Sequence, residues 1–372
     1  MKEFKIPLSQ PDITDLERRY VMEVLQTPNL SLGPKLPEFE KKVSDYVGTR
    51  FAVAVNSGTS ALHCCIKSFG IGPGDEVITS PFSFIATSNA ALFEGAKPVF
   101  VDIDPDTYNI DFRQIEEKIT ERTKAIIPVH VFGLPAEMDA INKIAKKYNL
   151  RVLEDAAEAI GAEYKKRKAG SLGDCAVFAF YPNKQITTGE GGIIVTDNES
   201  LAALCRSLRN QGRGDTSGWL QHQRLGYNYR LSDINCALGI AQMERLSEIL
   251  DKRTRVAQWY LEQLHDVPEL TTQQIPANCK KSWFVFVVAL SPLYSKKSRD
   301  EILSHLRKKG IACSNYFSPI HLQPFMAARF GYKEGDFPVT ESLSKRTIAL
   351  PFFANLSKEN VRYVTDVLKN SL

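Results

Sequence analysis

Residues 153–192 read LEDAAEAIGAEYKKRKAGSLGDCAVFAFYPNKQITTGEGG and hold two strand-like runs with reactive side chains at their ends. The first run closes on Glu154 and Asp155. The second, CAVFAF, leads into a loop that carries Lys184 and ends in a glycine-rich turn. In open α/β sheets, ligands bind beyond the carboxyl ends of the strands. The spacing therefore predicts a site that contains both a carboxylate and an amine.

The two residue types indicate a particular cofactor chemistry. A lysine between an apolar strand and a glycine turn is partly desolvated and can act as a nucleophilic amine. An aspartate paired with a lysine is the arrangement that pyridoxal phosphate requires. The lysine bonds covalently to the cofactor, and the aspartate keeps the pyridine nitrogen protonated. Taken singly, Lys184 would be interpreted as a surface lysine and Asp155 as a helix cap.

Outward from this stretch, strands and helices alternate over the first two-thirds of the chain. This alternation predicts an α/β fold with a mostly parallel sheet and helices on both faces. Helices are expected after the strand at 51–55, near 86–93, and in a segment that ends about Tyr148. The predicted strands are 51–55, 76–79, 98–103, 124–129, 151–153, 175–180 and 192–196.

The chain changes character after a long helical pattern at 231–264. A strongly apolar strand at 283–290 is followed by helices at 299–309 and 358–368. This part predicts a smaller α+β domain. We expect a large domain over residues 1–250 and a small one over 251–372.

Residues 56–62, NSGTSAL, are a candidate phosphate site because they follow the strand FAVAV and open a helix. Gly58 permits close approach of the backbone. Thr59 and Ser60 add hydroxyl and N–H groups at a helix N-terminus, where anions bind. The alternative is a plain Ser/Thr helix cap.

Two further segments carry weaker signals. In SPFSFIATSN, residues 80–89, Phe82 and Phe84 are of a type more often found in a core, although one aromatic beyond a strand end could cover a flat heterocycle. In GYNYR, residues 226–230, Arg230 could bind a carboxylate through its fork, or it could pair with Asp233.

Composition excludes several classes of protein. The 372 residues carry a net charge of +4, which is weak for this length and predicts no nucleic-acid partner and no basic membrane patch. No apolar run approaches 18 residues, and the N-terminus lacks a signal core. Seven cysteines without a CxxC pair indicate reduced thiols in a cytoplasmic enzyme and no metal site.

Six motifs together resemble the DegT/DnrJ/StrS family of pyridoxal-phosphate aminotransferases, which act on nucleotide-linked keto sugars. They are NSGTSAL, SPFSFIAT, PVHVFG, EDAAEAIGA, FYPNKQITTGEGG and LGYNYRLSDINCALG. The resemblance covers nearly the whole chain, as far as PIHLQPF and TIALPFF. It implies a fold type I transferase that works as a homodimer with shared sites. The implied reaction moves an amine from L-glutamate to a ketone carbon of a nucleotide-linked, 6-deoxy sugar.

The resemblance also implies roles for individual residues at the cofactor ring. Lys184 would bond to the cofactor and move protons, Asp155 would pair with the pyridine nitrogen, and Phe84 would stack on the ring. Glu158 stands where Gln or His is frequent in the family. A second carboxylate beside the ring is unusual, so we expect Glu158 to be either protonated or turned away.

At the phosphate, the resemblance assigns Gly58 and Thr59 through their backbone groups, with the Thr59 or Ser60 hydroxyl nearby. Asn228 would reach the same phosphate from the second subunit. Ala179 replaces a serine that is common in the family, so one hydroxyl contact is missing.

On the substrate side, the resemblance suggests Arg230 for the carboxylate of the amino donor and His321 for the substrate. Three alternatives remain open. One is a sugar dehydratase, although those relatives carry His in place of the lysine. Another is a lyase of the same fold, and the third is a non-catalytic sensor.

Overall fold

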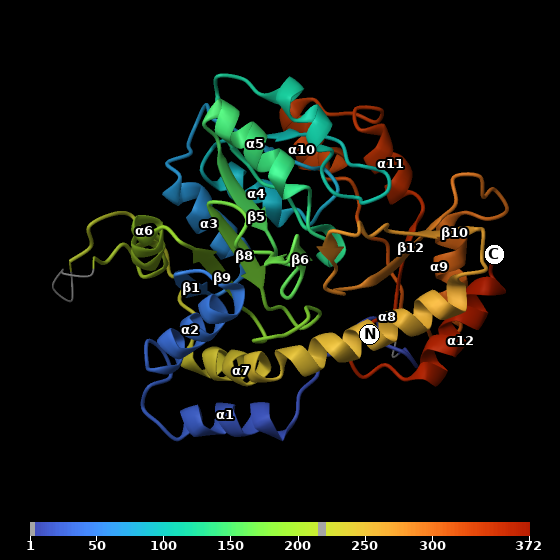
Figure 1. Cartoon of the computed structure of the whole chain (residues 1–372), viewed down its shortest axis with the longest axis horizontal. Coiled ribbons are helices and arrows are strands. Elements are labelled where there is room, and N and C mark those ends of the chain that lie inside the picture. The colour runs from blue at the N-terminus through green and yellow to red at the C-terminus, as the bar shows by residue number, and fades with distance from the viewer. Residues whose placement is uncertain (1–3, 215–220) are drawn as a thin grey trace.

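The core of the computed structural model, which describes residues 4–214 and 221–372, is a seven-stranded sheet (Figure 1). β9 runs antiparallel to β1 and β8, whereas the other neighbouring strands are parallel, which confirms the predicted α/β fold. In sheet order the strands are β1 (Phe51–Val55), β9 (Gly192–Thr196), β8 (Cys175–Ala179), β5 (Arg151–Asp155), β4 (Thr123–Ile126), β2 (Glu76–Thr79) and β3 (Lys97–Phe100).

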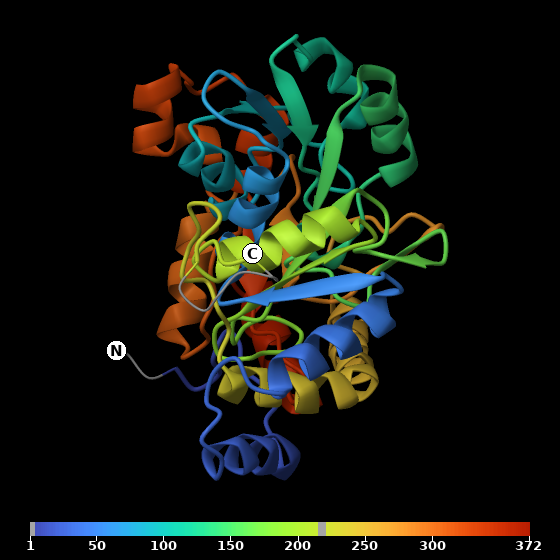
Figure 2. The ribbon, with the colours of Figure 1, turned by 90° about the vertical axis from the view of Figure 1, so that its left-hand side faces the viewer.

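Helices cover both faces of this sheet, because alternate side chains of each strand point to opposite sides. In β1, Ala52 and Ala54 pack into the core beneath α2 and α7, whereas Val53 and Val55 pack against α3 and α6. In Figure 2, α6 crosses in front of the sheet. One face carries α3 (Gly58–Ser68), α4 (Ala86–Phe93) and α6 (Glu199–Arg209), and the other carries α2 (Lys35–Val47), α5 (Met138–Tyr148) and α7 (Asp233–Glu244).

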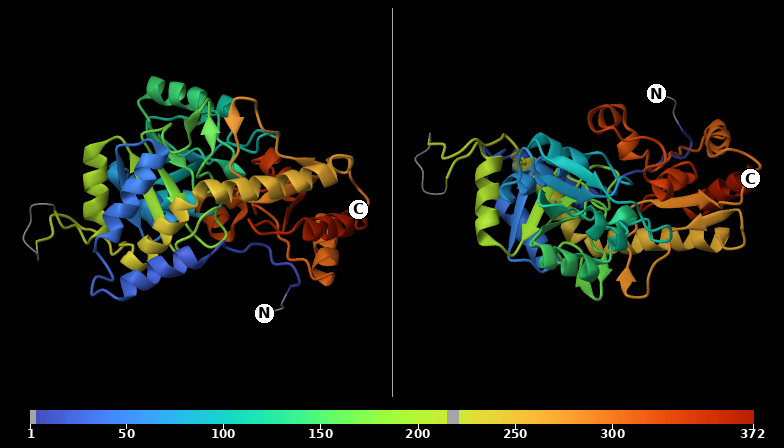
Figure 3. Two further views of the ribbon diagram at one scale, coloured as in Figure 1. Left: turned by 60° about the horizontal axis from the view of Figure 1, so that its bottom comes forward. Right: turned by 90° about the horizontal axis from the view of Figure 1, so that it is seen from above.

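A second core lies in the C-terminal part of the chain. There β10 (Leu270–Thr272), β12 (Phe286–Leu290) and β13 (Thr347–Leu350) form an antiparallel sheet. The helices α9 (Arg299–Lys308), α12 (Lys358–Lys369) and the C-terminal half of α8 (Leu246–Leu264) complete this core. Figure 3 shows α8 extending from the large sheet towards α12.

The predicted domain boundary at residue 250 falls within α8. Leu246 and Ile249 pack in the core of the large sheet, and Val256 and Tyr260 pack in the C-terminal core. Ile6 also packs in the C-terminal core, although it lies near the start of the chain. The division into two domains stays a prediction. Ile6 does not follow it, because this residue belongs to the predicted large domain but packs in the C-terminal core.

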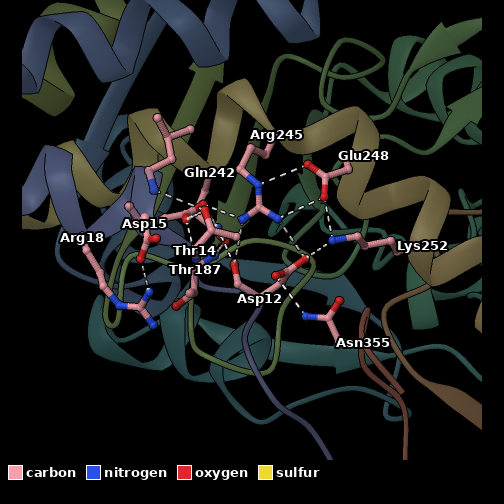
Figure 4. A network of polar contacts seen from close by, with 12 residues as sticks. Asp12, Thr14, Asp15, Arg18, Thr187, Gln242, Arg245, Glu248, Lys252 and Asn355 are labelled. Carbon is pink, nitrogen blue, oxygen red and sulfur yellow. Dashed lines mark hydrogen bonds and ion pairs between the residues drawn. The ribbon is translucent and has the colours of Figure 1, made fainter. Parts of the chain in front are cut away.

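The long helix predicted over 231–264 is wrong in one respect, because the chain breaks it at Arg245 into α7 and α8. The side chain of Arg245 binds Glu17 at 2.8 Å and Asp12 at 3.1 Å, so residues from a distant part of the chain contact the break. Figure 4 shows Arg245 beside Asp12. Asp12 also accepts hydrogen bonds from Lys252 and Asn355. This network joins the N-terminal segment to α8 and to the segment that follows β13.

None of the helices in the described part of the chain is both long and apolar enough to cross a membrane.

The remaining elements are short or lie outside the two main sheets. The elements are α1 (Asp15–Leu25), α10 (Pro324–Phe330), α11 (Pro338–Ser344), a small sheet of β11 (Cys279–Lys280), β6 (Glu163–Tyr164) and β7 (Arg167–Lys168), and 3₁₀ turns at Phe112–Gln114, Glu116–Lys118, Val131–Gly133 and Ile320–Leu322.

Candidate active site

A cavity of about 460 Å³ opens at the carboxyl ends of β5 and β8, beside the start of α3. Asp155 and Glu158 line it from the end of β5, and Lys184 lines it from the loop after β8. The wall also contains Gly58 and Thr59 of α3. Residues predicted from separate motifs therefore meet in one cavity.

Asp155 is the last residue of β5 and is 5% exposed. One carboxylate oxygen accepts a hydrogen bond from the Thr87 hydroxyl at 2.6 Å, and the other accepts from the Ala157 N–H at 3.2 Å. Across residues 4–214 and 221–372, no cation forms an ion pair with Asp155. The carboxylate is thus held in place by neutral donors and retains acceptor capacity towards the cavity.

The neighbouring Glu154 has a different task, because it points to the opposite side of the strand. It is fully buried and accepts hydrogen bonds from His130 and from the N–H groups of Gly170, Leu172 and Gly173. Such a saturated carboxylate fixes the end of β5 and leaves the chemistry to Asp155.

Lys184 lies between a carboxylate and an aromatic ring. Its Nζ is 3.6 Å from a carboxylate oxygen of Glu158 and 4.1 Å from the centre of the Phe284 ring. The side chain is only 13% exposed, in line with the partial desolvation that the sequence predicts. The sequence predicted no ion pair for this amine, and the structure gives it one with Glu158.

Glu158 is neither turned away nor solvated. Its second oxygen accepts the Phe132 N–H at 2.9 Å, and burial raises the pKa of Glu158 above its ordinary value, while the charge of Lys184 offsets part of that shift. Of the two expectations for this residue, orientation away from the site is wrong, and a raised proton affinity has support.

The N-terminus of α3 forms a tight cradle. A Cβ on Gly58 would lie 2.7 Å from the Cβ of Ala179, and a Cβ on Gly192 would lie 2.4 Å from the Ser57 carbonyl, so both positions require glycine. The first N–H groups of a helix have no acceptor within it, and here they belong to Gly58 and Thr59. The cradle therefore suits a phosphate.

Ser60 plays a different part from the one predicted. Its hydroxyl donates to the side chain of Asn56 at 2.7 Å, and its N–H is capped by the Ser57 hydroxyl at 3.0 Å. Ser60 does not line the cavity. Its hydroxyl stabilises the start of the helix, which leaves Thr59 as the hydroxyl at the cradle.

Aromatic side chains form much of the remaining wall. Phe84 is 63% exposed and lines the cavity, where it can cover a flat ring. Phe284 and Tyr316 also line it, and neither was identified from the sequence, because both come from distant segments without a local pattern. Thr87 was missed as well, although it lies within the quoted motif SPFSFIAT.

Like Ser60, the predicted residues Asn228 and Arg230 lie outside this cavity. Asn228 is exposed, and its carbonyl faces the side chain of Asn56 at 3.5 Å. Arg230 donates to Asn210, and Asp233 instead accepts the N–H groups of Gly33 and Lys35. The alternative interpretation of Arg230, a pairing with Asp233, is therefore wrong.

His321 is the clearest departure from the predicted site. It is fully buried and binds Glu341 at 3.0 Å, and burial lowers the pKa of His321 despite this partner. Because the side chain has no exposed surface and does not line the cavity, the structure does not bring His321 to the site, and its contact with substrate stays a prediction.

The donor set fits pyridoxal phosphate. The cradle of α3 suits its phosphate, Asp155 can accept from a protonated ring nitrogen, Phe84 can cover the ring, and Lys184 is placed as an amine. By contrast, no group of three or more His, Cys, Asp or Glu among the residues that the structure describes could hold a metal ion. Fold and site together define a fold type I pyridoxal-phosphate enzyme.

Comparison with known proteins identifies the family. A sequence model of the DegT/DnrJ/EryC1/StrS aminotransferase family matches residues 11–369. The chain belongs to this family and is a pyridoxal-phosphate-dependent aminotransferase.

Individual relatives resemble the chain over nearly its full length. GDP-perosamine synthase of Caulobacter vibrioides is 40% identical over 99% of this chain and 98% of its own. UDP-4-amino-4-deoxy-L-arabinose–oxoglutarate aminotransferase of Shewanella sediminis is 35% identical over 96% of each chain. The sugar aminotransferase Spr1654 of Streptococcus pneumoniae has been solved in its PLP and PMP forms. This chain superposes on the PLP form with a TM-score of 0.91 and 28% identity, over 99% of each chain.

Proposed function

We propose that the protein transfers an amino group from L-glutamate to a ketone carbon of a nucleotide-linked, 6-deoxy keto sugar. The observation that carries this proposal is the meeting of Lys184, Asp155 and the α3 cradle in one cavity. The names of two relatives support the substrate class, since they join GDP or UDP to a sugar, and one of them names oxoglutarate, the keto acid that glutamate becomes.

Each residue of the cavity has a distinct part in this reaction. When bound, pyridoxal phosphate supplies a conjugated ring that accepts electron density from the α-carbon of the donor. Asp155 holds the proton on the ring nitrogen, and the N–H groups of Gly58 and Thr59 bind the phosphate. The Nζ of Lys184 would take the proton from the α-carbon of the donor and deliver it to the cofactor carbon on the other side of the amine nitrogen.

We further propose a homodimer in which each site receives residues from both chains. Within the described wall of the cavity, Lys184 is the one cation, whereas Asp155, Glu158 and Glu190 are acidic. A cofactor phosphate, a donor carboxylate and a nucleotide bring several negative charges to this wall. Asn228 is exposed and Arg230 is half-buried in their own chain, and both lie outside its cavity, so they can serve the site of a partner.

We also propose that the protein functions in the cytoplasm, on the basis of its cysteines. All seven are free, and six of them are buried, which supports a protein that functions in the reducing cytoplasm.

The test is a screen of nucleotide-linked keto sugars with L-glutamate, in which NMR identifies the aminated carbon. Lys184→Ala is the control, and we expect it to fold normally but to lose turnover and the visible absorbance of the cofactor-loaded enzyme. Full turnover in this variant, or no amination of any keto sugar, would contradict the proposal.

A further inference from the structure

Arg253 is a buried guanidinium without a counter-charge. It lies on α8, is 3% exposed, and forms no ion pair with any carboxylate of the described chain. Its Nε donates to the Trp283 carbonyl at 2.7 Å and its Nη2 to the Phe284 carbonyl at 2.6 Å. Burial lowers the pKa of Arg253 to about 9. Burying a charge without an opposite charge is costly, so this arrangement needs a reason.

The two carbonyls belong to the segment that forms one wall of the active site. Phe284 lines the cavity, and its ring centre lies 4.1 Å from the Nζ of Lys184. The preceding Ser282 is held from the other side, since its N–H donates to Gly133 and its hydroxyl accepts from Gln185 at 3.0 Å. Arg253 and Lys184 also line the same narrow crevice.

We propose that Arg253 is a positioning residue for Lys184, because its fork fixes the Phe284 ring against the lysine amine. This inference rests on the proposed role of Lys184. The ring face attracts an ammonium and offers it no hydrogen-bond acceptor, so it limits where Nζ can lie. Glu158 restrains the same atom from its own direction.

The choice of arginine follows from the geometry. Two consecutive carbonyls are bound by two donors of one rigid, planar group. A lysine would keep the charge of Arg253 but would present a single flexible ammonium. Arg253→Lys therefore removes the paired hydrogen bonds of the guanidinium while keeping the positive charge.

The first test uses the chain without cofactor and measures how fast a small amine-reactive reagent labels Lys184 across a range of pH, by peptide mass spectrometry. Lys280, whose side chain is 70% exposed, is the internal reference. We expect Arg253→Lys and Phe284→Leu each to raise the labelling rate of Lys184 about threefold or more, in keeping with the weaker cation–π energies.

The double variant decides whether Arg253 acts through the ring. If it does, Arg253→Lys adds little to Phe284→Leu, because residues that act through one contact are not additive. Fully additive effects, or unchanged labelling in Phe284→Leu, would overturn the proposal. Labelling of Phe284→Leu can be measured even if Arg253→Lys does not fold, since Phe284→Leu keeps the two hydrogen bonds of Arg253 to backbone carbonyls.

Arg245→Lys is the matched control, because Arg245 is also a largely buried arginine, directly before α8, but it binds Asp12 and Glu17. It should destabilise the fold and leave labelling of Lys184 unchanged.

In the loaded enzyme, Arg253→Lys should lower kcat about 10- to 100-fold and leave the KM for glutamate within about twofold, as expected for a misplaced group. An equal effect of Arg245→Lys on labelling would reduce Arg253 to a structural residue. Labelling does not depend on turnover, so it tests whether Arg253 positions Lys184 even if Lys184→Ala refutes the proposed function.

Discussion

The Nζ of Lys184 forms its ion pair with Glu158, at 3.6 Å, and not with Asp155. Glu158 in turn is anchored by the Phe132 N–H, and Asp155 by the Thr87 hydroxyl. These two carboxylates of the cavity thus have different partners. Glu158 neutralises the lysine, and Asp155 remains available to the ring nitrogen of the cofactor.

This division predicts a strong energetic coupling between Lys184 and Glu158. In the chain without cofactor, Lys184→Ala leaves a buried carboxylate unpaired, so adding Glu158→Gln should then raise the free energy of unfolding. In the native background, Glu158→Gln should be neutral or destabilising, because it leaves the ammonium unpaired. We expect a coupling energy of about 1–3 kcal/mol, measured by urea unfolding of the four proteins. A coupling below about 0.5 kcal/mol would contradict a functional ion pair.

Asp155→Asn should keep the fold and the bound cofactor, because the amide can still exchange hydrogen bonds with Thr87 and Ala157. It cannot hold a proton on the ring nitrogen. We expect the half-reaction with L-glutamate to slow roughly 10²-fold or more, measured by stopped-flow absorbance.

Glu154→Gln is the matched control for this prediction. Its carboxylate adjoins Asp155 in the chain but binds His130 and three backbone N–H groups. We expect it to lose about 1–3 kcal/mol of unfolding free energy and to keep the native half-reaction rate once folded. Near-native rates in Asp155→Asn would make Asp155 a structural residue.

Glu17 predicts a pH dependence of stability. Burial alone would raise the pKa of Glu17, but hydrogen bonds from Thr14 and Arg245 lower it from its ordinary value of 4.5 to about 2. A lowered folded-state pKa stabilises the fold above pH 4.5, and this contribution is lost as the pH falls through about 2. Glu17→Gln should therefore cost roughly 1–3 kcal/mol at neutral pH.

The signature is that this cost shrinks between pH 4.5 and 2, as followed by chemical unfolding. Glu23→Gln is the control on the same helix, since Glu23 is 53% exposed and lies 3.9 Å from Arg19. It should change stability by less than about 0.5 kcal/mol. A cost of Glu17→Gln that does not vary with pH would show that the carboxylate acts through packing alone.

The sequence predicted the elements whose signal is local. The strands at 76–79 and 192–196 have the predicted bounds, because each is a short apolar run between turn residues. The break at Arg245 could not be predicted, since it depends on Asp12 and Glu17, more than 220 residues away in the chain.

The same distinction explains the site. Asp155, Lys184 and the α3 cradle follow directly from strand ends, and the structure brings them together. The partner of Lys184 depends on how the turn after β5 directs Glu158, and Phe284 arrives from the C-terminal part of the chain. His321 stands in a motif that resembles the substrate side, but its burial against Glu341 is set by tertiary packing.

The last prediction concerns Asn228 and the proposed dimer. Ser232 caps α7 in its own chain, and Asn228 is exposed, so the helix does not explain Asn228. If Asn228 serves the partner's phosphate, Asn228→Asp disables that site by setting a carboxylate against the phosphate. Lys184→Ala disables a site by removing its amine. A mixed dimer of these two inactive chains carries both defects in one site and neither in the other.

Activity should therefore reappear when the two variants exchange subunits. With equal amounts and random pairing, about a quarter of all sites become native, because half of the dimers are mixed and each has one intact site. Native mass spectrometry confirms the exchange, and the rate of amination measures recovery. If Asn228 acted within its own chain, every site would keep one defect and the mixture would stay inactive. An inactive mixture with proven exchange would thus reject the shared site while leaving Lys184 and Asp155 in their roles.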